Sequence, residues 1–160
     1  MKTFALLIAS LGALLLSAGC ATNPAPKNLA ETAAATPQLS TLTKLIQDAG
    51  LTGTLTGPGP FTVFAPTDEA FKAVPAATMQ ALAQDKTRLQ AVLSHHVIAG
   101  AVMAADVKNG SVKTVQGGNL ALSKSGTFVT VEDAVVTTAD VRATNGVVHI
   151  VDKVLIPPAR

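Results

Sequence analysis

Residues 60–71 read P-F-T-V-F-A-P-T-D-E-A-F, and their order predicts a strand that turns directly into a helix. The run F-T-V-F consists of β-branched and aromatic residues, which favour a short strand covered in part on both faces. Thr67 is suited to cap the helix that follows, and Asp68 places negative charge in its first turn. Pro66 and Phe71 have the spacing of a hydrophobic staple around that cap. The stretch therefore predicts a rigid strand-to-helix corner, whose structural residues are Phe61, Thr62, Phe64, Pro66, Thr67, Asp68 and Phe71.

A second informative stretch lies at residues 145–157, N-G-V-V-H-I-V-D-K-V-L-I-P. Asn145 and Gly146 separate two β-rich runs, and Asn-Gly is the preferred loop of a type I′ hairpin. With these residues as the loop, Arg142 pairs with His149 across the hairpin, and both fall on its polar face. We treat Arg142 and His149 as candidate interaction residues. The opposite, apolar face is predicted to hold Val141, Ala143, Val148 and Ile150.

Between these two stretches lies a third, L-S-H-H-V-I-A-G at residues 93–100. The three segments, in this order and at these separations, resemble the fasciclin (FAS1) domain family over residues 38–158. The first resembles that family's first conserved block, the last its second, and His95-His96 its tyrosine-histidine motif, with His95 at the tyrosine position. The resemblance implies an α+β fold in which a mixed β-sheet wedge packs against several short helices. It also implies a role in interaction and adhesion.

The two adjacent histidines are predicted to face different surroundings. If a helix capped by Asp85 continues through them, Leu89, Val92 and His96 recur at helical spacing on its inner face. His96 is therefore expected in the core, with its ring nitrogens satisfied by nearby polar groups. His95 falls on the wetter side and is a candidate interaction residue. Adjacent helical residues point about 100° apart, so the pair does not predict a metal site.

Periodicity and turn residues divide the remainder of the domain. Ser40 and Gly50 are suited to begin and end one helix, and Pro75 to begin another. Helices are predicted at 39–49, at 75–83 and from Asp85 onward, and strands at 111–115, 119–122, 127–131 and 134–138. Helices that precede a run of strands favour the α+β class.

Composition limits the function further. Lys and Arg number 12 against 10 Asp and Glu, and the chain has neither Trp nor Tyr, so binding to nucleic acid is not expected. The sequence lacks G-x-S-x-G, H-E-x-x-H and G-x-G-x-x-G, and the neighbouring acidic pairs at 68–69 and 132–133 are explained as helix-start and turn charges. We therefore expect no catalysis, no cofactor and no metal.

The first residues have the pattern of an export signal. Lys2 precedes an apolar run of about 13 residues, which is too short to span a bilayer as a helix. The sequence L-L-S-A-G-C resembles a bacterial lipobox, with cleavage between Gly19 and Cys20 and lipidation of Cys20. Residues 1–19 are thus predicted to be a signal peptide, 20–37 a flexible Ala/Thr/Pro tether, and 38–158 one domain. Cleavage without lipidation, and soluble secretion, is the alternative.

Two functions follow from these observations. The first is a non-enzymatic domain tethered to the cell envelope, at the outer membrane in a Gram-negative cell, that contacts protein or matrix partners in adhesion. Its only membrane contact would be the lipid anchor. The alternative is a binder or carrier of a small apolar or envelope-derived ligand, which needs a concave apolar pocket of about 300 Å³ or more.

Overall fold

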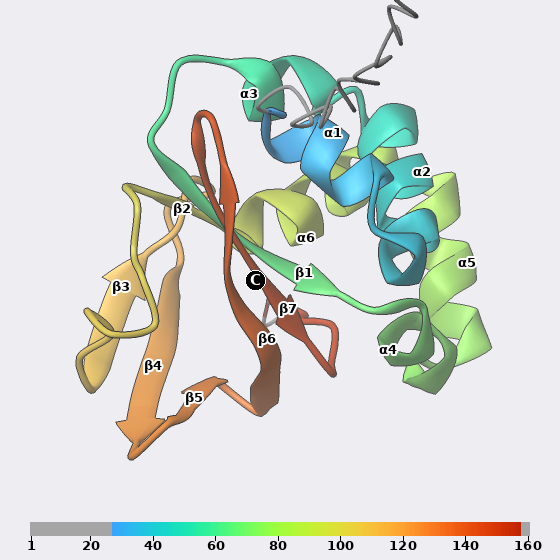
Figure 1. Cartoon of the computed structure of the whole chain (residues 1–160). Coiled ribbons are helices and arrows are strands. Elements are labelled where there is room, and N and C mark those ends of the chain that lie inside the picture. Colours follow the sequence, from blue (N-terminus) through green and yellow to red (C-terminus); the bar gives the residue numbers. More distant parts are fainter. Residues whose placement is uncertain (1–26, 158–160) are drawn as a thin grey trace, which may run out of the picture.

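Strand β1 (Phe61–Pro66) runs through the middle of the computed structural model, which describes residues 27–157 (Figure 1). It pairs in antiparallel orientation with β2 (Val97–Ala99) and in parallel with β7 (Gly146–Val151). Val63 belongs to the apolar core on one face of the sheet and Phe64 to the core on the other. The prediction of a strand covered on both faces is confirmed.

The sheet is mixed and curls until its two edges meet. Its order is β2-β1-β7-β6-β5-β4-β3, where the further strands are β3 (Gly110–Lys113), β4 (Asn119–Ser125), β5 (Phe128–Val131) and β6 (Ala134–Ala143). Ile98 in the edge strand β2 forms a bridge with Thr114, just beyond the opposite edge strand β3. Beside it, the amide of Val115 donates to the carbonyl of Val97 at 2.8 Å. The curl encloses one apolar core, which includes Phe64, Ile98, Leu120, Leu122, Val131 and Val151.

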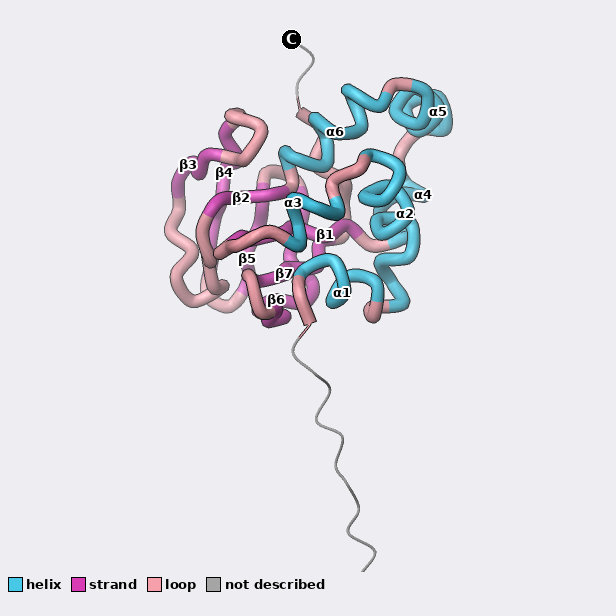
Figure 2. Tube along the Cα trace, turned by 90° about the horizontal axis from the view of Figure 1, so that it is seen from above, coloured by secondary structure: helices cyan, strands magenta, loops and turns pink. Residues whose placement is uncertain are grey.

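The helices gather on the outer side of the curled sheet (Figure 1; Figure 2). They are α1 (Leu29–Ala34), the 3₁₀ turn η1 (Pro37–Leu39), α2 (Ser40–Ala49), α3 (Thr52–Thr56), α4 (Asp68–Ala73), α5 (Ala76–Gln84) and α6 (Lys86–His95). A second apolar core lies between them and the sheet. The predicted α+β class, with a mixed sheet and several short helices, is confirmed. Within residues 27–157 no helix combines the length and the apolar composition that crossing a membrane requires.

The strand-to-helix corner forms as the sequence predicts. The hydroxyl oxygen of Thr67 accepts from the amide of Ala70 at 3.2 Å and so caps α4. Asp68 also reaches a second helix: its carboxylate accepts from the amide of Thr41 at 2.8 Å and from the hydroxyl of Ser40 at 2.7 Å. The Thr41 amide is the main reason that the pKa of Asp68 lies below its usual value. Ser40 was expected to cap α2 with its own side chain, but Asp68 caps α2 from the neighbouring helix instead.

Two elements differ from the sequence-based expectation. The prediction of a flexible tether over residues 20–37 is wrong for residues 29–34, which form α1. Leu29 of this helix is buried, and Asn28 and Glu31 form a capping box at its N-terminus. The second difference is smaller: α6 ends at His95, one residue before the end of the predicted helix, with His96 as its C-cap, and β2 follows at once from Val97. In both cases a short segment takes its structure from tertiary contacts rather than from a long periodic pattern.

The Asn-Gly hairpin is also corrected. β6 and β7 pair with Ala143 opposite Gly146, two residues away from the predicted register, so Arg142 lies opposite Val147 instead of His149. Neither Asn145 nor Gly146 has the positive φ that a type I′ loop requires. A shift of two residues keeps the faces of the strand unchanged, so Val148 and Ile150 still share one apolar face as predicted, and the structure packs this face against the helices.

Asn145 takes this conformation because its polar groups bind other parts of the chain. Its side-chain amide donates to the carbonyls of Leu55 at 2.7 Å and Gly57 at 3.0 Å, and its Oδ1 accepts from the amide of Leu29 at 2.9 Å. Its main-chain carbonyl accepts from the amide of Phe61 at 3.1 Å. Asn145 thus joins α1 and the end of α3 through its side chain, and the start of β1 through its main chain.

Gly146 is required by a close approach between two backbones. A Cβ atom at this position would overlap the carbonyl of Phe61 in the neighbouring parallel strand. The overlap is with main-chain atoms of the central strand, so rotation of a side chain does not relieve it.

We predict that Gly146→Ala lowers the free energy of unfolding by at least about 3 kcal/mol, because β1 and β7 must move apart. The measurement is urea denaturation followed by circular dichroism. Gly53→Ala in α3 is the matched control, since a Cβ there meets nothing within 4 Å, and it should not destabilise the protein. Equal stability of the two variants would contradict the role assigned to Gly146.

Candidate functional site

The polar side chains of the three sequence motifs lie largely inside the fold. Thr62 is buried, and its hydroxyl donates to the carbonyl of Gly100 at 2.7 Å and accepts from the amide of Val102 at 2.8 Å. These bonds hold the chain that follows β2 against β1. Thr62, Thr67, Asp68 and Asn145 thus all make hydrogen bonds that hold the fold together.

His96 is a core residue, as the helical spacing predicts. Its Nδ1 lies 2.7 Å from the carbonyl oxygen of Val92, and its Nε2 accepts from the amide of Leu155 at 3.0 Å. An imidazole that accepts at Nε2 and donates at Nδ1 is neutral. Burial lowers the pKa of His96 from 6.5 to about 4, because removal from water disfavours the charged ring.

His149 was predicted as a surface interaction residue, and this is wrong. Its ring is buried, stacks on Phe64 with the ring centroids 5.5 Å apart, and bonds at both nitrogens. Nε2 lies 2.7 Å from the carbonyl oxygen of Val102, and Nδ1 accepts from the amide of Asp140 at 3.2 Å. The alternation of β7 correctly predicts which face of the strand carries His149, but both faces of this strand are covered. Arg142, on the neighbouring strand, is exposed as predicted.

His95 was also expected on the wetter side, yet only 2% of the residue is exposed. The turn between β3 and β4 covers the end of α6, and Gly118 of that turn lies against the imidazole ring. Nε2 is 3.8 Å from a carboxylate oxygen of Glu132. Within residues 27–157 neither ring nitrogen has a hydrogen-bond partner, which distinguishes His95 from the other two histidines.

His95 lies in a groove of about 490 Å³, which we call the His95 groove. One wall is formed by α5 and α6, through residues such as Leu82 and Val92, and the other by the β3–β4 turn and the segment after β7. Arg88 is the only residue with a full charge among the described residues that line it. The groove could not be found from the sequence, because its residues come from four separate segments without a common motif.

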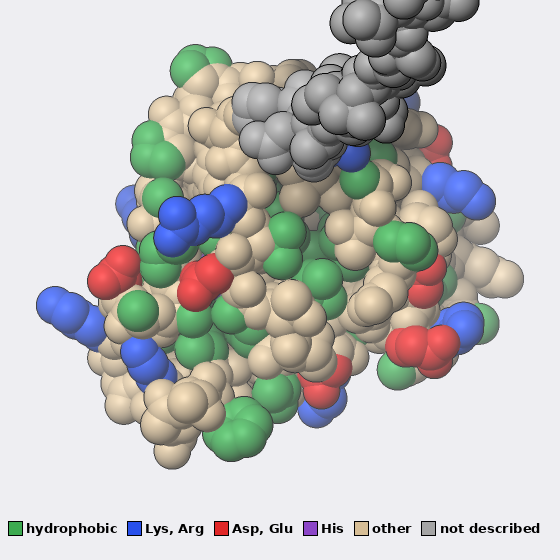
Figure 3. Space-filling view, in the orientation of Figure 1, with side chains coloured by type: hydrophobic (Ala, Val, Ile, Leu, Met, Phe, Trp, Pro, Cys, Tyr) green, Lys and Arg blue, Asp and Glu red, His purple; other side chains and the backbone are tan. Residues whose placement is uncertain are grey.

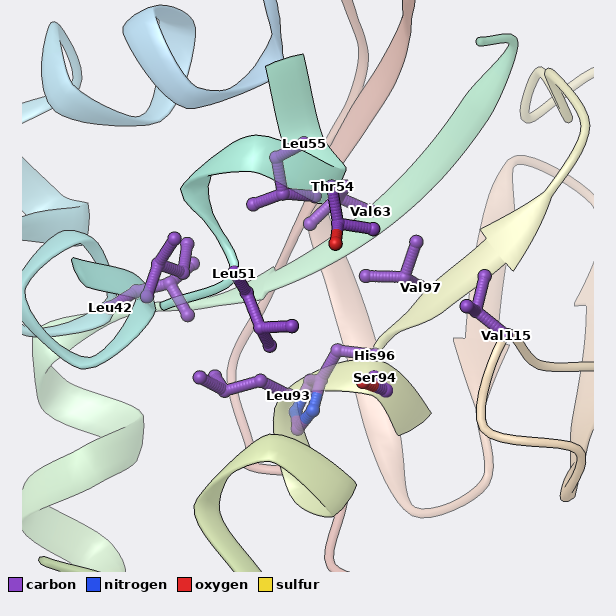
Figure 4. Close-up of a pocket in the computed structure, with 11 residues that line it drawn as sticks. Leu42, Leu51, Thr54, Leu55, Val63, Leu93, Ser94, His96, Val97 and Val115 are labelled. Atoms are coloured by element: carbon purple, nitrogen blue, oxygen red, sulfur yellow. The ribbon is translucent and has the colours of Figure 1, made fainter. Parts of the chain in front are cut away.

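A second, apolar pocket lies deeper, among α2, α3, α6 and the strands β1 and β2 (Figure 4). Leu51, Leu55, Val63 and Val97 line it, and Val115 stands at one side. Its volume of about 20 Å³ has room for roughly one water molecule. In this conformation the pocket cannot enclose an apolar ligand.

The surface has two distinct ends. The amide of Thr144, at the tip of the β6–β7 hairpin, donates to the carbonyl of Lys27 at 2.9 Å, so the described chain begins beside this hairpin. The turn between β4 and β5 lies at the opposite end in Figure 1, where Phe128 is 68% exposed. The described chain ends at Pro157, beside the His95 groove and on the side of the molecule away from Lys27 (Figure 2).

On the face shown in Figure 3, charged side chains of both signs are scattered without a large region of one sign. Among residues 27–157 no three His, Cys, Asp or Glu side chains come together in a way that could hold a metal ion. Gly19 and Cys20, the predicted cleavage and lipidation residues, lie outside the described residues.

Comparison with known proteins gives consistent matches. The family model for the Fasciclin domain matches residues 37–157. Protein sll1483 of Synechocystis is 41% identical over 132 residues, which cover 81% of this chain and 73% of the relative. Cell surface glycolipoprotein MPB83 of Mycobacterium bovis is 38% identical over 148 residues, 89% of this chain and 64% of the relative. The solved FAS1 domain pair of the insect cell adhesion molecule Fasciclin I superposes with a TM-score of 0.71 at 16% identity, over 82% of this chain and 51% of that one.

The geometry of His96 predicts its contribution to stability. His96→Leu leaves the carbonyl of Val92 and the amide of Leu155 buried without partners, so the free energy of unfolding should fall by more than about 1 kcal/mol at pH 7. An unchanged midpoint in urea denaturation would contradict this role.

The same variant tests a pH dependence. The unfolded chain takes up a proton on this ring near pH 6.5, whereas the folded protein does so only near pH 4. Stability is therefore lost as the pH falls between these values, by roughly 3 kcal/mol in total. His96→Leu should lose less stability than the wild type between pH 7 and pH 4, measured as the difference between the two proteins at each pH.

Proposed function

This chain belongs to the fasciclin domain family, and we propose that it is an exported, non-enzymatic domain that mediates adhesion from the cell envelope. Its matches include a cell surface glycolipoprotein and an insect cell adhesion molecule. Its partners would be proteins or matrix components outside the cell.

The observation that carries the proposal is the position of Phe128. Of the four phenylalanines within residues 27–157, Phe64 and Phe71 are buried and Phe61 is half-buried, whereas Phe128 is 68% exposed at the tip of a hairpin. Aromatic side chains are frequent anchors of protein interfaces, because they bury a large area with little loss of rotamer freedom. An isolated aromatic ring on a protruding turn suits a contact with a partner.

The attachment point favours the same orientation. Lys27 lies beside the β6–β7 hairpin, at the end of the molecule opposite to the β4–β5 turn (Figure 1). If Cys20 carries lipid, about seven residues connect it to Lys27 and reach at most about 25 Å. The β6–β7 hairpin, with Arg142, would then face the membrane, and Phe128 would point away from it.

The alternative function is that of a carrier of a small apolar ligand. It has less support, because the deep apolar pocket is too small to enclose such a ligand. The apolar pocket near Leu51 and His96 holds about 20 Å³, far below the volume that small-molecule sites require. The adhesive role therefore accounts better for the described surface.

Attachment through Cys20 gives a prediction in living cells. Residues 1–19 would direct export, and cleavage after Gly19 would leave Cys20 as the lipidated first residue. Wild-type chain grown with a clickable palmitate analogue should carry the label in the membrane fraction. Cys20→Ala should be unlabelled, because the thioether cannot form. Label of equal intensity on both chains, or on neither, would refute lipid anchoring.

Adhesion is tested in a deletion strain that carries one variant at a time. The wild-type gene should restore attachment to surfaces coated with matrix proteins, and Phe128→Ser should reduce attachment at least about fivefold at equal surface expression, because the anchoring ring is lost. Arg142→Ser is the matched control, an exposed residue at the end near Lys27, and should attach as the wild type does. Loss of attachment in Arg142→Ser with retention in Phe128→Ser would reverse the proposed orientation. Equal attachment by the deletion and wild-type strains would refute the adhesive role.

A further inference from the structure

We propose that a hollow beside the β6–β7 hairpin binds phospholipid headgroups of the bilayer to which the chain is anchored, so that this end of the domain rests on the membrane. The inference rests on the proposed anchoring at Cys20. It adds to the lipid chain a second membrane contact, which the folded domain makes itself. Phe128, at the other end of the domain, takes no part in it.

The hollow lies where three segments meet at one end of the molecule. They are the α3–β1 loop, the segment after β2 and the tip of the β6–β7 hairpin (Figure 1). Its volume of about 630 Å³ lies within the range of small-molecule sites, roughly 300–1,000 Å³. We call it the Arg142 hollow, and its main lining residues are Pro58, Pro60, Ala101, Met103, Arg142 and Val147.

Most of the lining side chains are apolar. Pro58 and Ala101 are exposed, Met103 is half-buried, and Val147 is buried. The amide of Asn145, which also lines the hollow, is already bonded to the carbonyls of two other residues. A strongly polar solute such as a sugar would find few hydrogen-bonding partners here. An apolar rim suits the boundary between the headgroups and the acyl chains of a bilayer.

The one charged group of the hollow favours a phosphate. Arg142 is exposed and is the only residue with a full charge among the described residues that line the hollow. It takes part in none of the salt bridges within residues 27–157. Asp140, two positions earlier on β6, accepts from the amide of Ala104 at 2.7 Å and does not line the hollow. A guanidinium binds phosphate through two parallel N–H donors, so Arg142 can hold the phosphate of a headgroup.

The point of attachment lies at the edge of the hollow. Thr144 lines it, and the amide of this residue donates to the carbonyl of Lys27, where the described chain begins, at 2.9 Å. Lys27 is exposed and adds a second cation at this end. The sequence holds no Asp or Glu before Glu31, so the segment that leads to Cys20 supplies no carboxylate that would compete for Arg142.

The short connection makes even a weak contact effective. About seven residues between Cys20 and Lys27 keep the hollow within about 25 Å of the bilayer. Short linkers give effective concentrations on the order of millimolar, so a headgroup contact with a dissociation constant of roughly 1 mM forms about half of the time. Attraction of the two cations to an anionic surface strengthens it. The covalent lipid retains the domain at the membrane in either case, and the contact sets its orientation.

The test supplies the anchor chemically. The chain from Cys20 onward is coupled through this residue, its only cysteine, to a maleimide lipid in nanodiscs of equal parts phosphatidylethanolamine and phosphatidylglycerol. A gadolinium chelate on some headgroups broadens the nuclear magnetic resonance signals of atoms that come close to the bilayer surface. The amides of Gly59 and Ala101, in the hollow, should broaden strongly. Those of Glu31 and Thr52, which line a separate cleft among α1, α2 and α3, should broaden weakly.

Charge reversal tests the guanidinium. Arg142→Glu should reduce the difference in broadening between the hollow and the separate cleft at least about fivefold, because repulsion from the phosphates replaces attraction. Lys153→Glu makes the same change of charge at an exposed residue beyond the far end of β7 and should keep the pattern of the parent chain. Both side chains are exposed, so both variants should fold, and circular dichroism checks that they do.

Two results would overturn the proposal. Equal broadening of the hollow and the separate cleft in the parent chain would mean that the tether alone brings the domain to the bilayer. An unchanged pattern in Arg142→Glu would mean that the guanidinium binds no headgroup. Because the maleimide lipid replaces the natural one, neither result depends on lipidation in cells, which the palmitate label on Cys20 tests separately.

Discussion

The fold depends on the close parallel contact between β1 and β7. Phe61 pairs with Gly146 at a distance that allows no side chain at the glycine, and this pair is the start of a six-residue parallel register. Asn145, immediately before the glycine, binds α1, the end of α3 and the first residue of β1. The two stretches that are most informative in the sequence are thus the two halves of one contact. Without this contact β1 would pair only with β2, and β7 only with β6, so the sheet would be divided into two parts.

The sequence predicts most of this architecture because the signals are local. Thr67 and Asp85 are recognisable as helix caps from their residue types and spacing, and both cap as expected. Gly50 ends α2 with positive φ for the same reason. The strands after residue 110 are found to within a few residues, since turn residues separate them. The residue types at these positions determine where the elements begin and end, and the tertiary contacts stabilise elements with the same bounds.

The errors arise where a distant segment decides the outcome. Asn145-Gly146 has the composition of a type I′ loop, but the bonds of Asn145 to Leu29, Leu55 and Gly57 impose another register. Alternation places His149 on one face correctly, yet it cannot show that the curled sheet covers that face as well. His95 is buried by the β3–β4 turn, which lies more than twenty residues further along the chain. Periodicity gives the direction of a side chain, whereas its exposure depends on what packs above it.

The central contact also sets when the domain can fold. The side chain of Asn145 bonds to a carbonyl 90 positions earlier, and β1 has no parallel partner until β7 has emerged. Contacts of such separation form late, because a long loop must close before they stabilise anything. The sheet therefore cannot be completed before the last strand is available, however early the helices form. The order of the strands in the sequence keeps the sheet open until nearly the whole domain is present.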